Sequence, residues 1–223
     1  MTRIRFHRAL DELRERTAQL GGLAERALEL SVRSFVQRES TMAAEVLRYE
    51  EKINASEREI DELAIDLLAM QQPMAIDLRL ILAILKINAD LERIGDQAVN
   101  IAERSRELSN GPAAEINIDL GAMATLARSM LRDALNAFGT EDADLARHVL
   151  ESDDELDDMN RHAFREVTKF VESSPHLSVA AIDHLIISRN LERVGDHATN
   201  IAEDVIFWLS GTDVRHNIAS WRA

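Results

Sequence analysis

The stretch Leu91-Glu-Arg-Ile-Gly-Asp-Gln-Ala-Val-Asn-Ile-Ala-Glu103 returns one hundred residues later as Leu191-Glu-Arg-Val-Gly-Asp-His-Ala-Thr-Asn-Ile-Ala-Glu203. Residues 85–104 and 185–204 are identical at twelve of twenty positions with this constant offset. An internal repeat of this kind indicates that one structural unit occurs twice in the chain. We therefore expect residues 1–110 and 111–223 to form two similar halves.

Both copies have the pattern of an α-helix, in which each residue turns by about 100° around the axis. On such a helix, four polar side chains of the first copy share roughly one quarter of the circumference. These side chains are Glu92, Asp96, Asn100 and Glu103. The neighbouring stripe of small and apolar residues contains Gly95, and a glycine inside a helix is less favourable than alanine by about 1 kcal/mol. Its recurrence at Gly195 predicts that another helix approaches closely there.

Helical periodicity covers most of the chain. We predict helices over Arg5–Gln37, from a cap at Ser40 or Thr41 to Met70, and over Met74–Leu108, Leu120–Phe138, Glu141–Val171 and His176–Leu209. Ser109–Ala113 is the expected linker between the halves, Gly139-Thr140 the expected turn and cap, and Gly21-Gly22 a site where the first helix bends. The only strand-like alternation, at residues 115–119, is too isolated to form a sheet. The expected fold is all-α, with two tandem three-helix bundles related by a pseudo-twofold axis.

The composition excludes several classes of function. With 26 basic and 40 acidic residues, the formal net charge of −14 argues against nucleic-acid binding, which needs clustered Lys and Arg. The absence of cysteine excludes disulfides, thiolate metal sites and cysteine nucleophiles, and fits a reducing cytoplasm. The longest apolar run, Leu80–Leu85, is far shorter than the roughly 20 residues of a membrane span. We therefore expect no direct insertion into a membrane.

A second polar stripe precedes the first copy of the repeat. It consists of Glu50, Asn54, Glu57 and Asp61, whose spacing places them within about 60° on one helix face. Asp153, Asp157 and Asn160 repeat the first three positions of this stripe in the second half, but Phe164 stands where Asp61 is expected. We predict that stripes from two helices meet in each half, so that each half contains one acidic site.

Carboxylate oxygens are ligands for hard and borderline cations, so two facing stripes could hold metal ions. The candidate metal ligands are Glu50, Glu57, Asp61, Glu92 and Asp96 in the first half and Asp153, Asp157, Glu192 and Asp196 in the second. A solvated acidic surface is the alternative, with Arg58, Arg93 and Arg193 forming ion pairs to neighbouring side chains.

An enzyme with a carboxylate-bridged metal centre is a further alternative. Such bundles use a Glu-x-x-His motif, and no Glu in this chain has a His three residues later. His197, beside Asp196, is either a metal ligand or a surface histidine, and its counterpart Gln97 argues against a symmetric ligand role. No phosphate-binding glycine loop or nucleophile motif is present.

Leu-Glu-Arg-(Ile/Val)-Gly-Asp followed by Asn-Ile-Ala-Glu resembles the PhoU family of phosphate-signalling proteins. The resemblance extends over nearly the whole chain, through Gln72-Pro73, Asp77-Leu-Arg79 and Asp213-Val-Arg-His216. It implies a PhoU-like fold of six helices and metal ions at the acidic motifs, with Fe, Mn, Zn, Ni and Mg as candidates. It also implies that the protein is not an enzyme but a cytoplasmic negative regulator of phosphate uptake and phosphate-starvation signalling. Its expected partners are a phosphate ABC transporter ATPase, a sensor histidine kinase and a second copy in a homodimer.

Overall fold

The computed structural model describes residues 3–37, 41–70 and 73–214. These residues form six α-helices, one short 3-10 helix and no strand. The helices are α1 (Arg3–Gln37), α2 (Met42–Met70), α3 (Ala75–Asn110), α4 (Leu120–Thr140), α5 (Ala143–Ser173) and α6 (Ser178–Ser210), with the 3-10 helix η1 (Pro175–Leu177) before α6. The predicted all-α class is confirmed.

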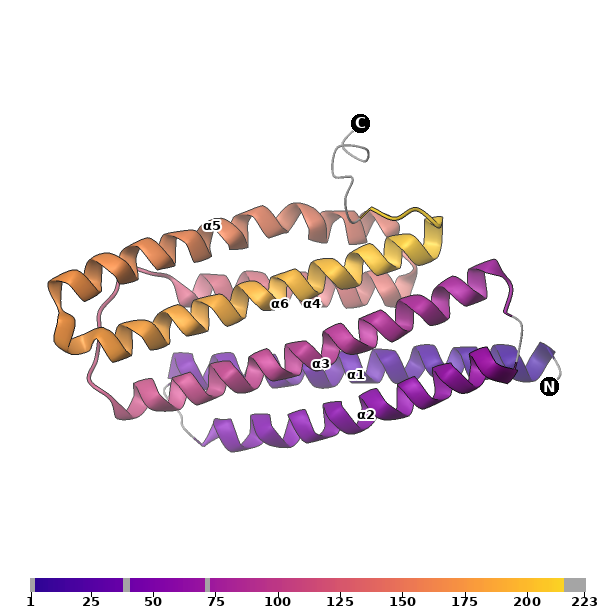
Figure 1. Cartoon of the computed structure of the whole chain (residues 1–223), viewed down its shortest axis with the longest axis horizontal. Helices are drawn as coiled ribbons and strands as arrows, with labels where there is room; N and C mark the ends of the chain where they lie inside the picture. The colour runs from indigo at the N-terminus through magenta and orange to yellow at the C-terminus, as the bar shows by residue number, and fades with distance from the viewer. Residues whose placement is uncertain (1–2, 38–40, 71–72, 215–223) are drawn as a thin grey trace.

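The helices form two three-helix bundles, α1–α3 and α4–α6, whose long axes run in nearly the same direction (Figure 1). Helices α3 and α6, which carry the two copies of the repeat, pack against each other where the bundles meet, and α1 also contacts α4. The predicted arrangement of two bundles is therefore confirmed. One hydrophobic core runs through both halves, so the division between residues 110 and 111 stays a prediction.

The repeated glycines lie where a neighbouring helix comes closest. A Cβ atom on Gly95 would lie 3.0 Å from Cδ1 of Ile53 in α2, and one on Gly195 would lie 2.5 Å from Cδ2 of Leu156 in α5. These distances leave no room for a larger side chain unless the neighbouring side chain moves. The close approach predicted from the repeat is confirmed, and it sets the separation of the two helices that carry each pair of polar stripes.

The glycine pair of the first helix includes one residue at a close contact between helices, and the predicted bend stays a prediction. Helix α1 continues without interruption through Gly21 and Gly22. A Cβ on Gly21 would lie 2.5 Å from Cδ2 of Leu135, whereas one on Gly22 would meet nothing within 4 Å. Gly21 therefore serves the contact between α1 and α4.

The turn before α5 lies two residues later than predicted. Gly139 and Thr140 belong to the last turn of α4, and Glu141 adopts the left-handed conformation with φ of 59°. Asp142 is the N-cap of α5, because its carboxylate accepts hydrogen bonds from the backbone N–H groups of Asp144 and Leu145 at 2.9 and 3.0 Å. The prediction of a turn and cap at Gly139-Thr140 was wrong because Asp142 provides the stronger cap.

The other predicted helix ends agree with the structure to within two residues. Thr41 directly precedes α2, whereas the alternative cap Ser40 lies outside the described residues, as do Gln72 and the end of the motif at residues 215–216. No helix within the described ranges is long and apolar enough to cross a bilayer.

Candidate metal centre

Each bundle brings its two polar stripes together. The first acidic cluster contains Glu50, Glu57 and Asp61 from α2 with Glu92 and Asp96 from α3, and the second contains Asp153 and Asp157 from α5 with Glu192 and Asp196 from α6. Asp96 and Asp196 are exposed and Glu192 is buried, whereas the other six are half-buried. The clusters are thus pseudo-equivalent in position, but their internal geometry differs.

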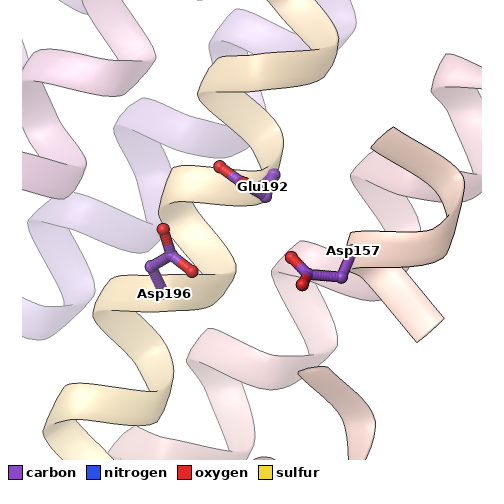
Figure 2. Close-up of side chains that lie close together, drawn as sticks. All are labelled: Asp157, Glu192 and Asp196. Carbon is purple, nitrogen blue, oxygen red and sulfur yellow. The ribbon is translucent and has the colours of Figure 1, made fainter. Parts of the chain in front are cut away.

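The second acidic cluster contains a compact group of three carboxylates. Figure 2 shows Asp157 on α5 pointing toward α6, where Glu192 and Asp196 lie one turn apart. One oxygen from each of the three side chains lies within 4.8 Å of the other two. Three carboxylate oxygens this close repel one another unless protons, arginines or a cation neutralise them.

Glu192 is the buried member of this group, with 8% of its surface exposed. Its Oε1 accepts a hydrogen bond from Nη1 of Arg189 at 3.0 Å. Its Oε2 is buried and has no hydrogen-bond partner among the described residues. A buried carboxylate oxygen without a partner is energetically unfavourable, and a bound cation would satisfy it. This atom is the strongest local indication that the cluster fits a metal ion.

The electrostatics of the second acidic cluster show the same crowding. Burial, and then the charges of Asp196 and Asp157, raise the pKa of Asp153 to about 6. Burial and the charge of Asp196 raise the pKa of Glu192, and burial with Asp157 raises the pKa of Asp196. The carboxyl groups of this cluster therefore lose their protons less readily than isolated carboxyl groups do.

The first acidic cluster is looser. Burial and the charge of Asp61 raise the pKa of Glu57, and burial with Asp96 raises the pKa of Glu92. Asp61, however, accepts a hydrogen bond from Nδ2 of Asn88 at 2.9 Å, so one of its oxygens already has a donor. Within the part of the chain that the structure describes, the first cluster does not form a group of three as compact as the trio in the second.

The donors of the second acidic cluster are all carboxylate oxygens. Oxygen-only sites suit Mg²⁺, Mn²⁺ and Fe³⁺, whereas Zn²⁺ and Ni²⁺ favour sites that include imidazole nitrogen. Of the five metals named as candidates, the chemistry of this trio thus fits Mg, Mn and Fe best.

The arginines that neutralise the second acidic cluster were not foreseen. Among the described residues, Arg58, Arg93 and Arg193 form no salt bridge, although the alternative of a solvated acidic surface expected ion pairs from them. Instead, Nη1 of Arg161 lies 3.1 Å from Oδ2 of Asp157, and Arg189 holds Glu192. Their positions three and four residues from an acidic residue are the signal that could have identified them.

The side chain of His197 is mostly buried, and one of its ring nitrogens contacts the other half of the molecule. Its Nδ1 lies 2.8 Å from Oδ1 of Asp90 on α3, and its side chain is 14% exposed. The expectation of either a metal ligand or a surface histidine missed this role, because the partner lies on the other half of the molecule.

Comparison with known proteins is consistent with this architecture. The family model described as the PhoU domain matches the chain twice, at residues 17–105 and 120–205. A protein from Pseudomonas putida, named a phosphate-specific transport system accessory protein PhoU homolog, is 40% identical over 212 residues, covering 95% of this chain and 83% of its own. A protein of the same name from Pseudomonas aeruginosa is 37% identical over 212 residues, covering 95% of this chain and 88% of its own.

Two crystal structures share the fold. PhoU from Pseudomonas aeruginosa aligns with a TM-score of 0.90 at 36% identity, over 93% of this chain and 100% of that one. The phosphate transport system regulatory protein PhoU from Streptococcus pneumoniae aligns with a TM-score of 0.82 at 27% identity, over 94% and 99%. Because the family model covers both halves and the relatives match along more than four fifths of their lengths, the chain belongs to the PhoU family.

Proposed function

We propose that this protein is a cytoplasmic negative regulator of phosphate uptake and of phosphate-starvation signalling. The observation that carries the proposal is the match of both duplicated halves to the PhoU domain, together with relatives named as accessory proteins of a phosphate-specific transport system. A regulator of this kind acts by binding other proteins. Its two bundles, joined along α3 and α6, offer large helical surfaces for such contacts.

The proposed partners are the ATPase of a phosphate ABC transporter and a sensor histidine kinase, which the protein connects as an adaptor. In this role it reports the state of the transporter to the kinase and keeps the kinase from activating the starvation response while phosphate is plentiful. We also propose that the protein forms a homodimer, which light scattering coupled to size-exclusion chromatography measures directly.

Deletion of the gene in its own organism tests the regulatory role. A phosphate-responsive promoter fused to a reporter is measured in phosphate-rich medium, in the wild type, the deletion strain and the deletion strain carrying the gene on a plasmid. Persistent expression in the deletion strain, reversed by the plasmid, is the expected result. Normal repression in the deletion strain would contradict the proposal.

We further propose that the second acidic cluster binds a divalent or trivalent cation through Asp157, Glu192 and Asp196. Two observations support this proposal. One carboxylate oxygen from each of the three residues lies within 4.8 Å of the other two, and Oε2 of Glu192 is buried without a hydrogen-bond partner. The cation would join α5 to α6 and remove the repulsion among the carboxylates. The first acidic cluster, through Glu92, Asp96 and their neighbours on α2, is proposed as a second and weaker site.

Elemental analysis of protein purified without chelator tests both sites. Wild type is compared with Asp196→Ala, Asp96→Ala and the double variant. The proposal expects the metal content to fall in Asp196→Ala and to fall further in the double variant. Equal metal content in all four proteins would show that these carboxylates are not ligands.

The two alternatives make different demands on the same experiments. A metal-dependent enzyme of the carboxylate-bundle type would use histidine ligands, and the trio consists of carboxylates alone. A metal-free scaffold requires wild type to contain no metal. Its acidic clusters would then be a hydrated surface, and the regulatory proposal would stand without the cation.

A further inference from the structure

A groove of about 600 Å³ lies between α5 and α6 beside the second acidic cluster. Three arginines, three apolar side chains and one amide line it: Asn160, Arg161, Phe164 and Arg165 from α5, and Leu185, Ile186 and Arg189 from α6. This is an unusual combination for a chain with a formal net charge of −14. The groove includes Phe164, the residue at which the internal repeat departs from its pattern.

The first half provides an internal comparison for this groove. The stripe of α5 repeats that of α2 with an offset of 103 residues, so Phe164 and Arg165 correspond to Asp61 and Glu62. Hydrogen bonds support this register. Asn88 on α3 donates to the backbone oxygen of Glu57 on α2, and Ser188 on α6 donates to Asn160 on α5.

The corresponding face of the first half therefore carries charges of both signs, from Arg58, Asp61 and Glu62, whereas the face in the second half is basic and apolar. On the last helix of the groove, Arg189 corresponds to Ala89 at the offset of 100 residues, and Ile186 corresponds to Lys86. The first half packs its core with Asp61 at this position, so core packing does not require an aromatic residue here. Phe164 is indeed outside the core, because 60% of its surface is exposed.

The charges of the groove are only partly neutralised. Arg161 pairs with Asp157 and Asp158, and Arg189 pairs with Glu192. Arg165 forms no salt bridge or hydrogen bond with the described residues. An exposed aromatic side chain surrounded by arginines has the composition that is enriched in the centres of protein interfaces.

We propose that this groove binds a segment of a protein partner that inserts one apolar side chain against Phe164, Leu185 and Ile186 and presents carboxylates to Arg161, Arg165 and Arg189. The inference rests on the proposed function and adds the location and the chemistry of the partner contact. A small organic anion fits less well, because small-molecule sites enclose about 70–90% of their ligand and Phe164 is largely open to solvent. Charge complementarity selects an acidic segment.

The position of the groove links docking to the cation site. Arg161 and Arg189 each hold a carboxylate of the proposed trio, Asp157 and Glu192. When carboxylates of the partner pair with these arginines, the trio loses part of its compensating positive charge. The trio then attracts a cation more strongly. By linkage, a bound cation then favours docking to the same degree.

Binding to purified partners tests the inference. The probes are the transporter ATPase and the cytoplasmic portion of the sensor kinase from the same organism, measured by biolayer interferometry against wild type and the double variant Phe164→Asp/Arg165→Glu. This variant reproduces the residues of the first half. Val179→Asp removes an exposed apolar side chain elsewhere, and Arg48→Glu reverses an exposed charge elsewhere. Both serve as controls, and urea unfolding verifies that every variant is folded.

We expect at least one probe to bind wild type, and the groove variant to bind that probe at least about tenfold more weakly, while the controls stay within about twofold of wild type. If the double variant does not fold, Phe164→Ser takes its place. Equal binding of wild type and groove variant would overturn the inference and leave the proposed function intact. Wild type that binds neither probe would overturn the adaptor function and the inference with it. A homodimer that the groove variant converts to a monomer would overturn the inference by identifying a second copy as the occupant.

Discussion

Nδ1 of His197 on α6 lies 2.8 Å from Oδ1 of Asp90 on α3, which joins the two halves at the middle of their contact. Nδ2 of Asn200 donates to the same oxygen of Asp90 at 3.3 Å. Salt bridges between α3 and α6 lie on either side: Lys86–Asp204 at 2.9 Å and Arg104–Asp183 at 3.4 Å. The two bundles are thus held in one orientation by specific polar contacts as well as by apolar packing.

The pair of His197 and Asp90 should stabilise the protein measurably. We expect Asp90→Asn to lower the free energy of unfolding by about 1–3 kcal/mol, because it removes a buried charged acceptor. The double variant Asp90→Asn/His197→Gln introduces the neutral amides found at the pseudo-equivalent positions, Asn190 and Gln97. Urea unfolding of the two single variants and the double variant gives the coupling energy.

The double variant should recover part of the loss, with a coupling of about 0.5–3 kcal/mol. If the effects of the two single substitutions simply add, the contact in the structure contributes nothing to joining the halves.

The glycine in the second copy of the repeat should be indispensable for packing. Gly195→Ala places a Cβ 2.5 Å from Cδ2 of Leu156, so we expect a loss of about 1–3 kcal/mol from overpacking in spite of the better helix propensity of alanine. Gly22→Ala is the matched control, because its Cβ meets nothing within 4 Å inside another helix. It should stabilise the protein by about 0.5–1 kcal/mol.

Thermal and urea unfolding of both variants make this comparison. A Gly195→Ala protein as stable as Gly22→Ala would show that the side chain of Leu156 makes room for the added methyl group, and that packing does not require this glycine.

The repeat made the helical architecture predictable, because its glycines, apolar stripe and polar stripe recur with one register. It did not identify the contacts between the halves. The pairing of Asp90 with His197 depends on how two helices align in space, and their sequence separation of 107 residues carries no such information. One signal was available. Both residues are ionisable, and both of their counterparts, Asn190 and Gln97, are neutral amides, so the two positions differ together.

The sequence predicted which helix faces carry the candidate site, but it did not predict the contacts of the individual side chains. Spacing alone assigned nine carboxylates to two clusters. It gave no indication that Asn88 would donate a hydrogen bond to Asp61 in the first half. Nor did it indicate that Arg189 would donate to one oxygen of Glu192 and leave the other without a partner. Those differences depend on rotamers and on neighbouring helices. The turn before α5 was misplaced for a similar reason, because the prediction relied on Gly139 and Thr140 and did not consider Asp142, whose carboxylate caps the helix.

The raised pKa of Asp153 predicts a specific dependence of stability on pH. Its folded-state pKa of about 6 lies above the ordinary value of 3.8, so between these values the folded protein binds more protons than the unfolded chain. Stability from this group therefore falls as pH rises through that range, and the loss is complete above it. Asp153→Asn removes the charge and should raise the melting temperature of chelator-treated protein at pH 7 but not at pH 4.

Melting curves at pH 4, 5, 6 and 7 follow this effect, at about 2–4 °C for each kcal/mol of relieved repulsion. Glu155 is an exposed carboxylate on the same helix and provides the control. Glu155→Gln should change the melting temperature only slightly, and by the same amount at every pH. A gain for Asp153→Asn that does not grow with pH would contradict the crowding of charge in the second acidic cluster.

We propose that the buried Glu192 completes a cation site with Asp157 and Asp196. Calorimetric titration of chelator-stripped protein with Mn²⁺ at pH 7.5 tests it most directly, in wild type, Glu192→Gln and the control Glu155→Gln. We predict that wild type and the control bind Mn²⁺ with similar affinity and that Glu192→Gln binds at least about tenfold more weakly. Equal affinity in all three proteins, or no binding by wild type, would contradict the claim.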